Sequence, residues 1–325
     1  MGSFQGKLAS VPATRLGSIA IERALKHAGL EASAVQEVFM GQVLQAGAGQ
    51  APARQAALGA GVGQDVPCTT VNKVCASGMK AIALGAQAIA LGDADIVVAG
   101  GMENMDQVPY LLPRGRWGHR MGDGVLHDAM LHDGLNDAFS GEHSGWHTED
   151  LVKKFDISRE EQDRWAARSH QRFSEAQAAG KFESEIVPVE MKTRKGAVTF
   201  DRDEQNRPDT TIETLAKLRP AFREDGTITA GNAPGLNSGA AAMIVAEASW
   251  AAENGLKPVA RLVSYGVGAV EPEMFGLGPV PAVREALERA GWTAADLGRV
   301  EINEAFAAIA VALVGALGLN EDIVN

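Results

Sequence analysis

Residues 69–92 read TTVNKVCASGMKAIALGAQAIALG, and this stretch decides the fold class. Its first residues are typical of a strand or the end of a strand, and the run that follows is apolar on every face of a helix. A helix that is apolar all round is buried, and Gly92 is a typical C-cap. The next segment, 93–101, reads DADIVVAGG and is a continuous apolar run of the kind found in parallel sheets. The order of strand, buried helix and strand predicts an α/β fold.

Cys75 stands between the predicted strand and the predicted helix. The unpaired N–H groups and the dipole at a helix N-terminus favour a thiolate over a thiol, and the thiolate is the nucleophilic form. We therefore expect a nucleophile at this position, although a buried and inert thiol is the commonest state of a free cysteine. Cys68, in DVPCTT, has no comparable setting and is interpreted as structural.

The composition of the 325 residues is that of a soluble globular protein, with 46% hydrophobic and 22% charged side chains. A net charge of −11 argues against nucleic-acid binding, but it allows an anionic small molecule beside a local basic patch. The first ten residues lack the apolar core of a signal peptide, and the apolar run 305–318 is shorter than the roughly 20 residues that span a bilayer. Two cysteines form no disulfide framework, so we expect a cytoplasmic protein with no membrane partner.

Two segments of the chain resemble each other at a fixed offset of 262 residues. Residues 20–42 read AIERALKHAGLEASAVQEVFMGQ, and residues 282–304 read AVREALERAGWTAADLGRVEINE. Each is typical of an amphipathic helix stopped by a glycine, then a turn and a short strand. Such units can look alike by chance, but the match along the whole segment predicts two similarly folded halves.

The offset also predicts that both halves are short at one end. The second copy is preceded by a predicted strand at 260–268, whose first-half counterpart would lie before residue 7. The counterpart of Cys75 would fall at position 337, beyond the end of the sequence. We expect the second half to be incomplete.

The sequence between the two halves differs in composition, because residues 107–235 are polar and carry most of the histidines. We predict three parts on this basis. A first half is formed by 1–106 and 236–257, an inserted loop domain by 107–235, and an incomplete second half by 258–325. Within the insertion, 158–182 is predicted to be an amphipathic helix with a serine cap.

Three polar residues stand where a ligand could meet backbone or a buried helix. His143 lies between glycines in SGEHSGW, so backbone could pass close to a ligand there. Asn303 and Glu304, in RVEINEAFAAIA, precede an apolar helix. They could cap that helix, or an amide could hold a water or a carbonyl oxygen. No pair of histidines has metal-ligand spacing with further ligands, so no metal is expected. The glycine-rich loops do not match GxGxxG, which weakens a dinucleotide-binding interpretation.

Five motifs stand in the order seen in thiolases: NKVCASGMKA, VAGGMENM, LAKLRPAF, GTITAGNA and EINEAFA. The likeness runs from residue 1 to residue 325, and the chain resembles the thiolase family. The resemblance implies the thiolase fold, with two similar βαβαβαββ halves in α-β-α-β-α layers and an inserted loop domain. It also implies the Claisen condensation of two acetyl-CoA to acetoacetyl-CoA, or the reverse thiolysis, through an acyl-cysteine.

The resemblance further implies roles for individual residues. Cys75 would carry the acyl group, and Asn303 would hold a water that polarises the carbonyl of the second substrate. The residues implied to bind the substrate and its CoA moiety are Leu135, His143, Arg219, Phe222, Ala230 and Phe306. Coenzyme A thioesters would be substrates, with no cofactor, and the protein would be a homodimer or a homotetramer.

The sequence departs from the family pattern at several points. Pro234 replaces a serine that would bond pantetheine, and Ser144 replaces a methionine of the acyl pocket. The family's GHP histidine and CxGGG cysteine do not occur in the 325 residues. Because lost acid–base groups typically cost about 10²–10⁴-fold in rate, a poorly active thiolase truncated at both ends is expected. The alternatives are a thiolase-fold protein that binds acyl-CoA without turnover, a ketoacyl synthase, and a hydrolase using Cys75 with His143.

Overall fold

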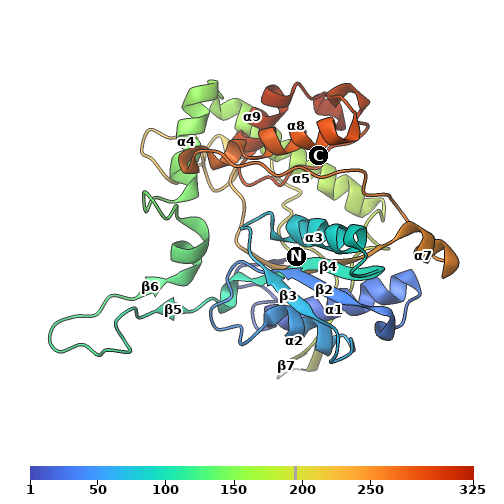
Figure 1. Cartoon of the computed structure of the whole chain (residues 1–325). Helices are drawn as coiled ribbons and strands as arrows, with labels where there is room; N and C mark the ends of the chain where they lie inside the picture. Colours follow the sequence, from blue (N-terminus) through green and yellow to red (C-terminus); the bar gives the residue numbers. More distant parts are fainter. Residues whose placement is uncertain (194–195) are drawn as a thin grey trace. The chain divides into compact units, whose positions relative to one another are not determined.

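The computed structural model describes residues 1–193 and 196–325 (Figure 1). The chain divides into two compact units, each built from three segments. Unit 1 comprises Met1–Gly134, Glu185–Gln205 and Leu236–Arg261. Unit 2 comprises Leu135–Ser184, Asn206–Gly235 and Leu262–Asn325.

Unit 1 is built on a five-stranded sheet with the order β1-β9-β4-β2-β3. The strands are β1 (Gly2–Ser3), β2 (Glu37–Gly41), β3 (Cys68–Val71), β4 (Ile96–Asn104) and β9 (Asn237–Ala246). β2 is parallel to both β3 and β4, whereas β9 is antiparallel to β4 and to β1. The predicted order of strand, helix and parallel strand is confirmed, with an antiparallel strand added beside β4.

Helices cover both faces of this sheet. The helices of unit 1 are α1 (Ala13–Ala28), α2 (Pro52–Gly59), α3 (Ser77–Leu91) and α7 (Ala248–Glu253). Successive residues of β4 point to opposite faces: Val98 packs in a cluster with Ile21 of α1, and Val97 packs in a second cluster with Ala81 of α3. Figure 1 shows α3 on one side of the sheet and α1 with α2 on the other.

The apolar helix α3 is buried on one face only. Its Ala81, Gly85 and Ala88 are buried, but Met79 and Leu91 are 76% and 78% exposed. The prediction that it is buried all round is therefore wrong for the outer face. By length and composition alone the stretch Val74–Leu91 could also cross a membrane, and one face of α3 packs on the sheet.

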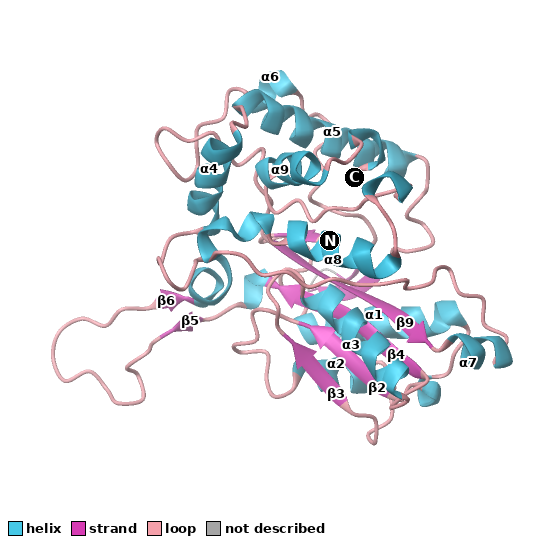
Figure 2. Ribbon diagram, turned by 45° about the horizontal axis from the view of Figure 1, so that its top comes forward, coloured by secondary structure: helices cyan, strands magenta, loops and turns pink. Residues whose placement is uncertain are grey.

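Two short hairpins complete unit 1. The first pairs β5 (Tyr110–Leu111) with β6 (His127–Asp128) and ends in the long loop seen in Figure 2. The second pairs β7 (Val189–Thr193) with β8 (Gly196–Phe200). Val189 and Phe200 of the second hairpin pack against Leu8 and Leu16, so this distant segment belongs to the core of unit 1.

Unit 2 is mainly helical and is centred on α9. Its helices are α4 (Ser144–Phe155), α5 (Arg159–Ala178), α6 (Ile212–Leu215), α8 (Pro279–Ala290) and α9 (Ala307–Leu317). Ile309 of α9 packs with Leu151 of α4, and Ala310 packs with Trp165 of α5. The first two turns of α9 are buried, as predicted for this apolar run, whereas Gly315 is exposed. The predicted serine cap on α5 is confirmed, because Ser158 forms a complete capping box.

The internal repeat is visible in the local structure. α1 ends at Gly29 and α8 ends at Gly291, both left-handed with φ of 70° and 68°. A short 3-10 turn follows each helix, at Ala32–Ala34 and at Ala294–Asp296. The same glycine is required for the same reason in both copies, since a side chain strains the left-handed C-cap conformation.

The predicted strands of the second half do not form as strands. The described segment 260–268 pairs with no neighbouring strand, and Val300 forms only an isolated bridge with Val324. A strand needs a neighbouring strand for its backbone N–H and C=O groups, and within the described residues 260–268 forms no such ladder. Two of its backbone groups bond to side chains of α8 instead: the Val267 N–H donates to Glu285, and the Tyr265 carbonyl accepts from Arg289. That segment instead passes very close to α8: a Cβ on Gly266 would overlap the carbonyl oxygen of Ala282.

Candidate active site

Cys75 lies in a strained turn between β3 and α3. β3 ends at Val71 and α3 begins at Ser77, and Cys75 as a whole residue is exposed, although its sulfur is partly desolvated by its surroundings. The preceding residue, Val74, has a φ of 48°, a conformation that β-branched residues rarely adopt. Backbone strain of this kind is typical of functional sites, where the surrounding structure enforces it.

Side-chain hydrogen bonds hold this turn in place. The Asn72 Oδ1 atom accepts from the Val74 N–H at 3.0 Å. The Ser77 hydroxyl accepts from the Lys73 N–H at 2.8 Å and donates to the Val74 carbonyl at 2.6 Å. Ser77 is 4% exposed, so its hydroxyl is buried and each of the two bonds is partly shielded from water. The strained Val74 conformation is therefore enforced from both sides.

The sheet beneath the turn is shaped for close packing. A Cβ on Gly41, at the end of β2, would lie 2.7 Å from the Ser77 Cβ, so glycine lets the first turn of α3 approach. The Glu103 carboxylate of β4 accepts from the N–H groups of Val43 at 2.9 Å and Leu44 at 3.3 Å. Burial raises the pKa of Glu103. The Asn72 amide donates to the Val43 carbonyl at 3.4 Å, which links this loop to the Cys75 turn.

The protonation of Cys75 differs from the sequence expectation. Burial of its sulfur raises the pKa of the Cys75 thiol, and the backbone N–H of Cys75 offsets this only in part. Desolvation of the thiolate is thus the larger of the two effects on this thiol. In this structure Cys75 is a protonated thiol at neutral pH, and a base must remove its proton before it can act as a nucleophile.

We therefore expect alkylation of Cys75 by iodoacetamide to rise with pH with a midpoint above that of the same cysteine in the urea-unfolded protein. The sign follows because burial favours the neutral thiol in the folded state and the reactive thiolate forms only above the raised pKa. Peptide mass spectrometry at a series of pH values separates Cys75 from Cys68. A midpoint below that of the unfolded protein would contradict the assignment of a protonated thiol.

Three of the candidate substrate-binding residues form one aromatic stack in unit 2. The rings of His143 and Phe222 are stacked, with centroids 4.7 Å apart and an interplanar angle of 21°. Phe222 in turn meets Phe306 edge to face, with centroids 5.9 Å apart. A Cβ on Gly145 would lie 2.4 Å from the Phe222 ring, so this glycine makes room for the stack.

The hydrogen bonds of His143 fix its tautomer. His143 caps α4, and its Nδ1 atom accepts from the Gly145 N–H at 2.9 Å. The proton of the neutral ring is therefore on Nε2, which is left as a donor. Burial lowers the pKa of His143, so the ring is neutral at pH 7. His143 can donate a hydrogen bond to an oxygen but carries no charge.

A small hairpin carries three of the candidate CoA-contacting residues. Pro220 and Thr229 form an antiparallel bridge, and the Ala221 N–H donates to the Ile228 carbonyl at 2.8 Å. The candidate residues borne by these paired segments are Arg219, Phe222 and Ala230. Arg219 and Ala230 are both exposed, so this hairpin presents a cationic side chain and a small, accessible residue to solvent.

Asn303 and Glu304 do not cap α9. The N-cap of α9 is Phe306, with no side-chain hydrogen bond, so the capping interpretation is wrong. Asn303 is exposed, and its side-chain amide has no hydrogen-bond partner within the described residues. Glu304 is instead bonded to α5, through the Trp165 indole and the Ser169 hydroxyl. The free amide of Asn303 is available to a ligand.

A buried polar network supports this part of unit 2 and was missed by sequence reasoning. The Asn232 amide donates to Asp163 at 2.9 Å, and Asp163 also accepts from Arg159 at 2.7 Å. The Asn232 carbonyl accepts from the N–H of Ala307, the first residue of α9, at 3.0 Å. Asp163 and Asn232 are 1% and 3% exposed. One signal was present in the sequence, because Asp163 lies on the apolar stripe of α5 that contains Ala166 and Ala167.

The candidate site residues are divided between the two units, and Leu135 is the last of them to be placed. Leu135 is half-buried at the end of a single π-helical turn, Leu131–Leu135. Cys75 belongs to unit 1 and the other seven candidate residues belong to unit 2. In the parts of the chain that the structure describes, no group of three or more His, Cys, Asp or Glu side chains is placed to hold a metal ion.

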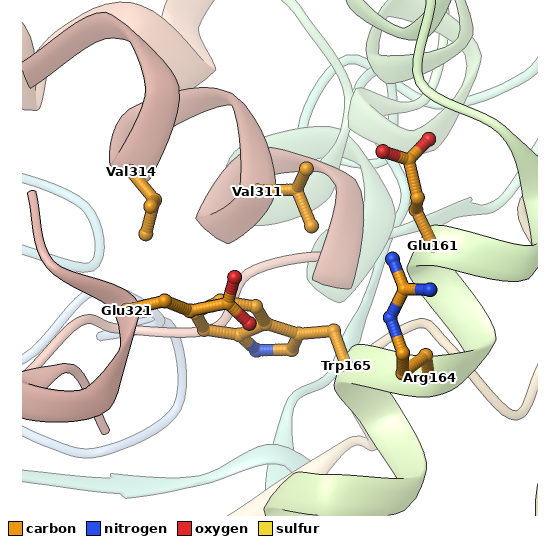
Figure 3. Close-up of a pocket in the computed structure, with 6 residues that line it drawn as sticks. All are labelled: Glu161, Arg164, Trp165, Val311, Val314 and Glu321. Atoms are coloured by element: carbon orange, nitrogen blue, oxygen red, sulfur yellow. The ribbon is translucent and has the colours of Figure 1, made fainter. Parts of the chain in front are cut away.

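Unit 2 also has a small hollow between α5 and α9, shown in Figure 3. It is lined by Glu161, Arg164, Trp165, Val311, Val314 and Glu321. None of the candidate site residues lines this hollow.

Comparison with known proteins shows a match along the whole chain. The N-terminal domain of thiolases matches residues 1–249, and the C-terminal domain of thiolases matches residues 256–325. The chain is 51% identical to an acetyl-CoA acetyltransferase of Pseudomonas aeruginosa and 50% identical to those of Allochromatium vinosum and Rhizobium meliloti. Each alignment covers 100% of this chain and 82–83% of the relative. The chain belongs to the thiolase family.

Proposed function

We propose that the protein is an acetyl-CoA C-acetyltransferase, which condenses two acetyl-CoA to acetoacetyl-CoA or catalyses the reverse thiolysis. The observation that carries the proposal is the exposed Cys75 in a strained turn before α3, in a chain about half identical to acetyl-CoA acetyltransferases. A strained turn that presents a thiol is typical of a nucleophile.

The chemistry proposed for Cys75 has two steps. Its sulfur attacks the carbonyl carbon of acetyl-CoA, the bond to the CoA sulfur breaks, and CoA leaves with the thiol proton. A second acetyl-CoA then loses a proton from its methyl carbon, and this carbon attacks the acetyl-cysteine. The new carbon–carbon bond forms as the bond to the Cys75 sulfur breaks, which gives acetoacetyl-CoA and restores the thiol. A covalent intermediate of this kind divides one difficult step into two easier ones.

The geometry of unit 2 supports a role in holding the substrate. The stack of His143, Phe222 and Phe306 offers an apolar surface with one neutral donor, which suits an acyl thioester. Arg219 is an exposed cation, and CoA is an anion, in a protein of net charge −11. The exposed, unpaired amide of Asn303 supports its proposed role as the holder of a water beside the second carbonyl. Leu135 and Ala230 are proposed as further substrate contacts.

The assembly and location are also proposals. We propose a homodimer or homotetramer in the cytoplasm, with no cofactor, no metal and no nucleic-acid or membrane partner. The two cysteines are free, which fits a reducing compartment. The division into a first half (1–106 and 236–257), a loop domain (107–235) and a second half (258–325) stays a prediction.

The direct test is turnover. We expect the protein to form acetoacetyl-CoA and free CoA from acetyl-CoA, or acetyl-CoA from acetoacetyl-CoA and CoA, measured by chromatography of the CoA thioesters. Malonyl-CoA and acetyl-pantetheine serve as comparison substrates. Binding of acetyl-CoA without any acetoacetyl-CoA in either direction would contradict the proposed activity and would leave a binding protein.

Replacing Gly145 by alanine is expected to weaken substrate binding. The new Cβ would lie 2.4–2.5 Å from three atoms of the Phe222 ring, so the ring must leave its place beside His143. Because the displaced ring no longer forms the surface proposed to hold the acyl thioester, the KM for acetyl-CoA should rise, by about tenfold if about 1.4 kcal/mol of contact with the substrate is lost. Gly315→Ala in α9 is the matched control, because a Cβ there meets nothing within 4 Å. An unchanged KM in Gly145→Ala would argue against a binding role for the stack.

A further inference from the structure

Glu304 connects the turn before α9 to α5 through both of its carboxylate oxygens. Oε1 accepts from the Trp165 Nε1–H at 2.6 Å, and Oε2 accepts from the Ser169 hydroxyl at 2.7 Å. Trp165 and Ser169 are one helical turn apart, so both donors face the same carboxylate. Hydrogen bonds to a charged acceptor are roughly twice as strong as neutral ones. Glu304 is thereby held at two points of one helix.

The α5 side of this contact is itself rigid. Trp165 is 5% exposed and packs with Ala307 and Ala310 of α9. The Arg168 guanidinium lies over its ring, 4.3 Å from the centroid. Figure 3 shows the Trp165 side chain extending from α5 toward α9. An indole fixed on both faces leaves its N–H one direction, toward Glu304.

The contact bears on the neighbouring residue, Asn303. The Asn303 carbonyl accepts from the Ala305 N–H at 2.8 Å, so residues 303–305 form a tight turn around the bound Glu304. The Ile302 N–H donates to the carbonyl of Asn325, which fixes the chain just before the turn. The Asn303 side chain is bound to nothing in the described chain. The turn therefore fixes the place from which the Asn303 side chain extends, and Glu304 is the side chain that holds the turn.

We infer that Glu304 is a positioning residue: by binding Trp165 and Ser169 it holds the turn that places the free amide of Asn303, the group proposed to hold a water beside the thioester carbonyl of the second substrate. This inference rests on the proposed function, because the second carbonyl belongs to the second acetyl-CoA of the condensation. Glu304 itself would not touch the substrate. It acts through Asn303, in the step that forms the carbon–carbon bond.

Variants at both ends of the contact test this role. Glu304→Ala removes both hydrogen bonds, and Ser169→Ala removes one. Glu304→Gln is the conservative variant: its carbonyl can still accept from Trp165, and its amide can donate to Ser169, because a hydroxyl also accepts. Ser158→Ala is the matched control, since it removes the N-cap of α5 and leaves Glu304 untouched.

Hydrogen exchange followed by mass spectrometry measures whether the turn is held. We expect faster exchange in peptides covering 300–306 for Glu304→Ala and Ser169→Ala, and exchange like that of the unaltered protein for Glu304→Gln. Ser158→Ala should lower the melting temperature without changing exchange in 300–306. Unchanged exchange in Glu304→Ala would overturn the inference.

Kinetics on the same variants separate positioning from stability. A misplacement of about 1 Å can cost about 10²-fold in rate, so condensation by Glu304→Ala should fall by about 10–10²-fold while acetylation of Cys75 is retained. Glu304→Gln should recover most of the rate, and Ser158→Ala should keep it. Equal loss of acetylation and condensation in Glu304→Ala would show a general structural role and overturn the inference. If the unaltered protein is neither acetylated nor active, the proposed function fails, while hydrogen exchange still reports whether Glu304 holds the turn.

Discussion

Replacing Cys75 by serine is expected to lower the turnover of acetyl-CoA by at least about 10⁴-fold, as for the loss of other covalent nucleophiles. The serine hydroxyl has a far higher pKa than a thiol and is a weak nucleophile without a strong base beside it. The turn itself should survive, because its hydrogen bonds come from Asn72, Ser77 and backbone groups. The loss should therefore appear in kcat and not in the melting temperature.

Cys68→Ser is the matched control for this variant. Cys68 lies at the start of β3, is half-buried, and its thiol donates to the Val66 carbonyl at 3.4 Å. A hydroxyl can make the same bond, so activity should be retained. Turnover that survives in Cys75→Ser, or that disappears equally in both variants, would argue against an acyl-cysteine at residue 75.

Replacing Asp163 by alanine is expected to lower the free energy of unfolding of unit 2 by about 3–5 kcal/mol, the usual cost of removing one partner of a buried ion pair. The side chain of Asp163 is 2% exposed and binds the Arg159 guanidinium through one oxygen and the Asn232 amide through the other. Alanine leaves the Arg159 Nε–H without its acceptor, although the guanidinium keeps its bonds to the Leu215 and Leu218 carbonyls. The buried Asn232 amide keeps only its bond to the Thr227 carbonyl. The first loss falls on the start of α5, and the second falls on the loop that contacts the first residue of α9.

Urea unfolding followed by tryptophan fluorescence measures this effect. Glu160→Ala is the control on the same helix, because Glu160 is exposed and such surface changes stay within about 0.5 kcal/mol. Asp163→Asn should fall between the two, since its carbonyl can still accept from Asn232 but its amide faces Arg159. A loss in Asp163→Ala no larger than that in Glu160→Ala would show that the network contributes little to unit 2.

Local signals in the sequence predicted the elements that depend on local physics. The glycines that end α1 and α8 are needed for a left-handed cap, and the Ser158 box fixes the start of α5. The apolar run of β4 matches a strand covered on both faces. Each of these features depends on residues that are close together in the sequence, so each could be predicted before the structure was known.

Elements that depend on a partner could not be predicted in the same way. The segment 260–268 has the composition of a strand, yet it lacks a neighbour to pair with. The composition of α3 predicted burial on every side, but a composition does not show which faces are covered. For Cys75 the dipole argument gave the wrong sign of the pKa shift, because desolvation depends on the packing around the sulfur.

In the candidate site, too, the sequence located single residues but did not show which distant residues they contact. The motifs located His143, Phe222 and Phe306, but their stacking joins residues from three distant segments. The bonds of Glu304 to Trp165 and Ser169 span 139 and 135 residues, and the bond from Asn232 to Asp163 spans 69. Periodicity reports only neighbours along the chain, so these buried polar pairings became visible only in three dimensions. The positive φ of Val74 has no sequence signal, since β-branched residues disfavour it.

The central claim is that Cys75 carries an acetyl group during the reaction. The most direct measurement is peptide mass spectrometry after a brief incubation with acetyl-CoA and an acid quench. We predict one acetyl group on the peptide containing Cys75, removed again when free CoA is added, and none on the peptide containing Cys68. Condensation activity with Cys75 unmodified at every time point, or acetyl label only on other residues, would contradict the account.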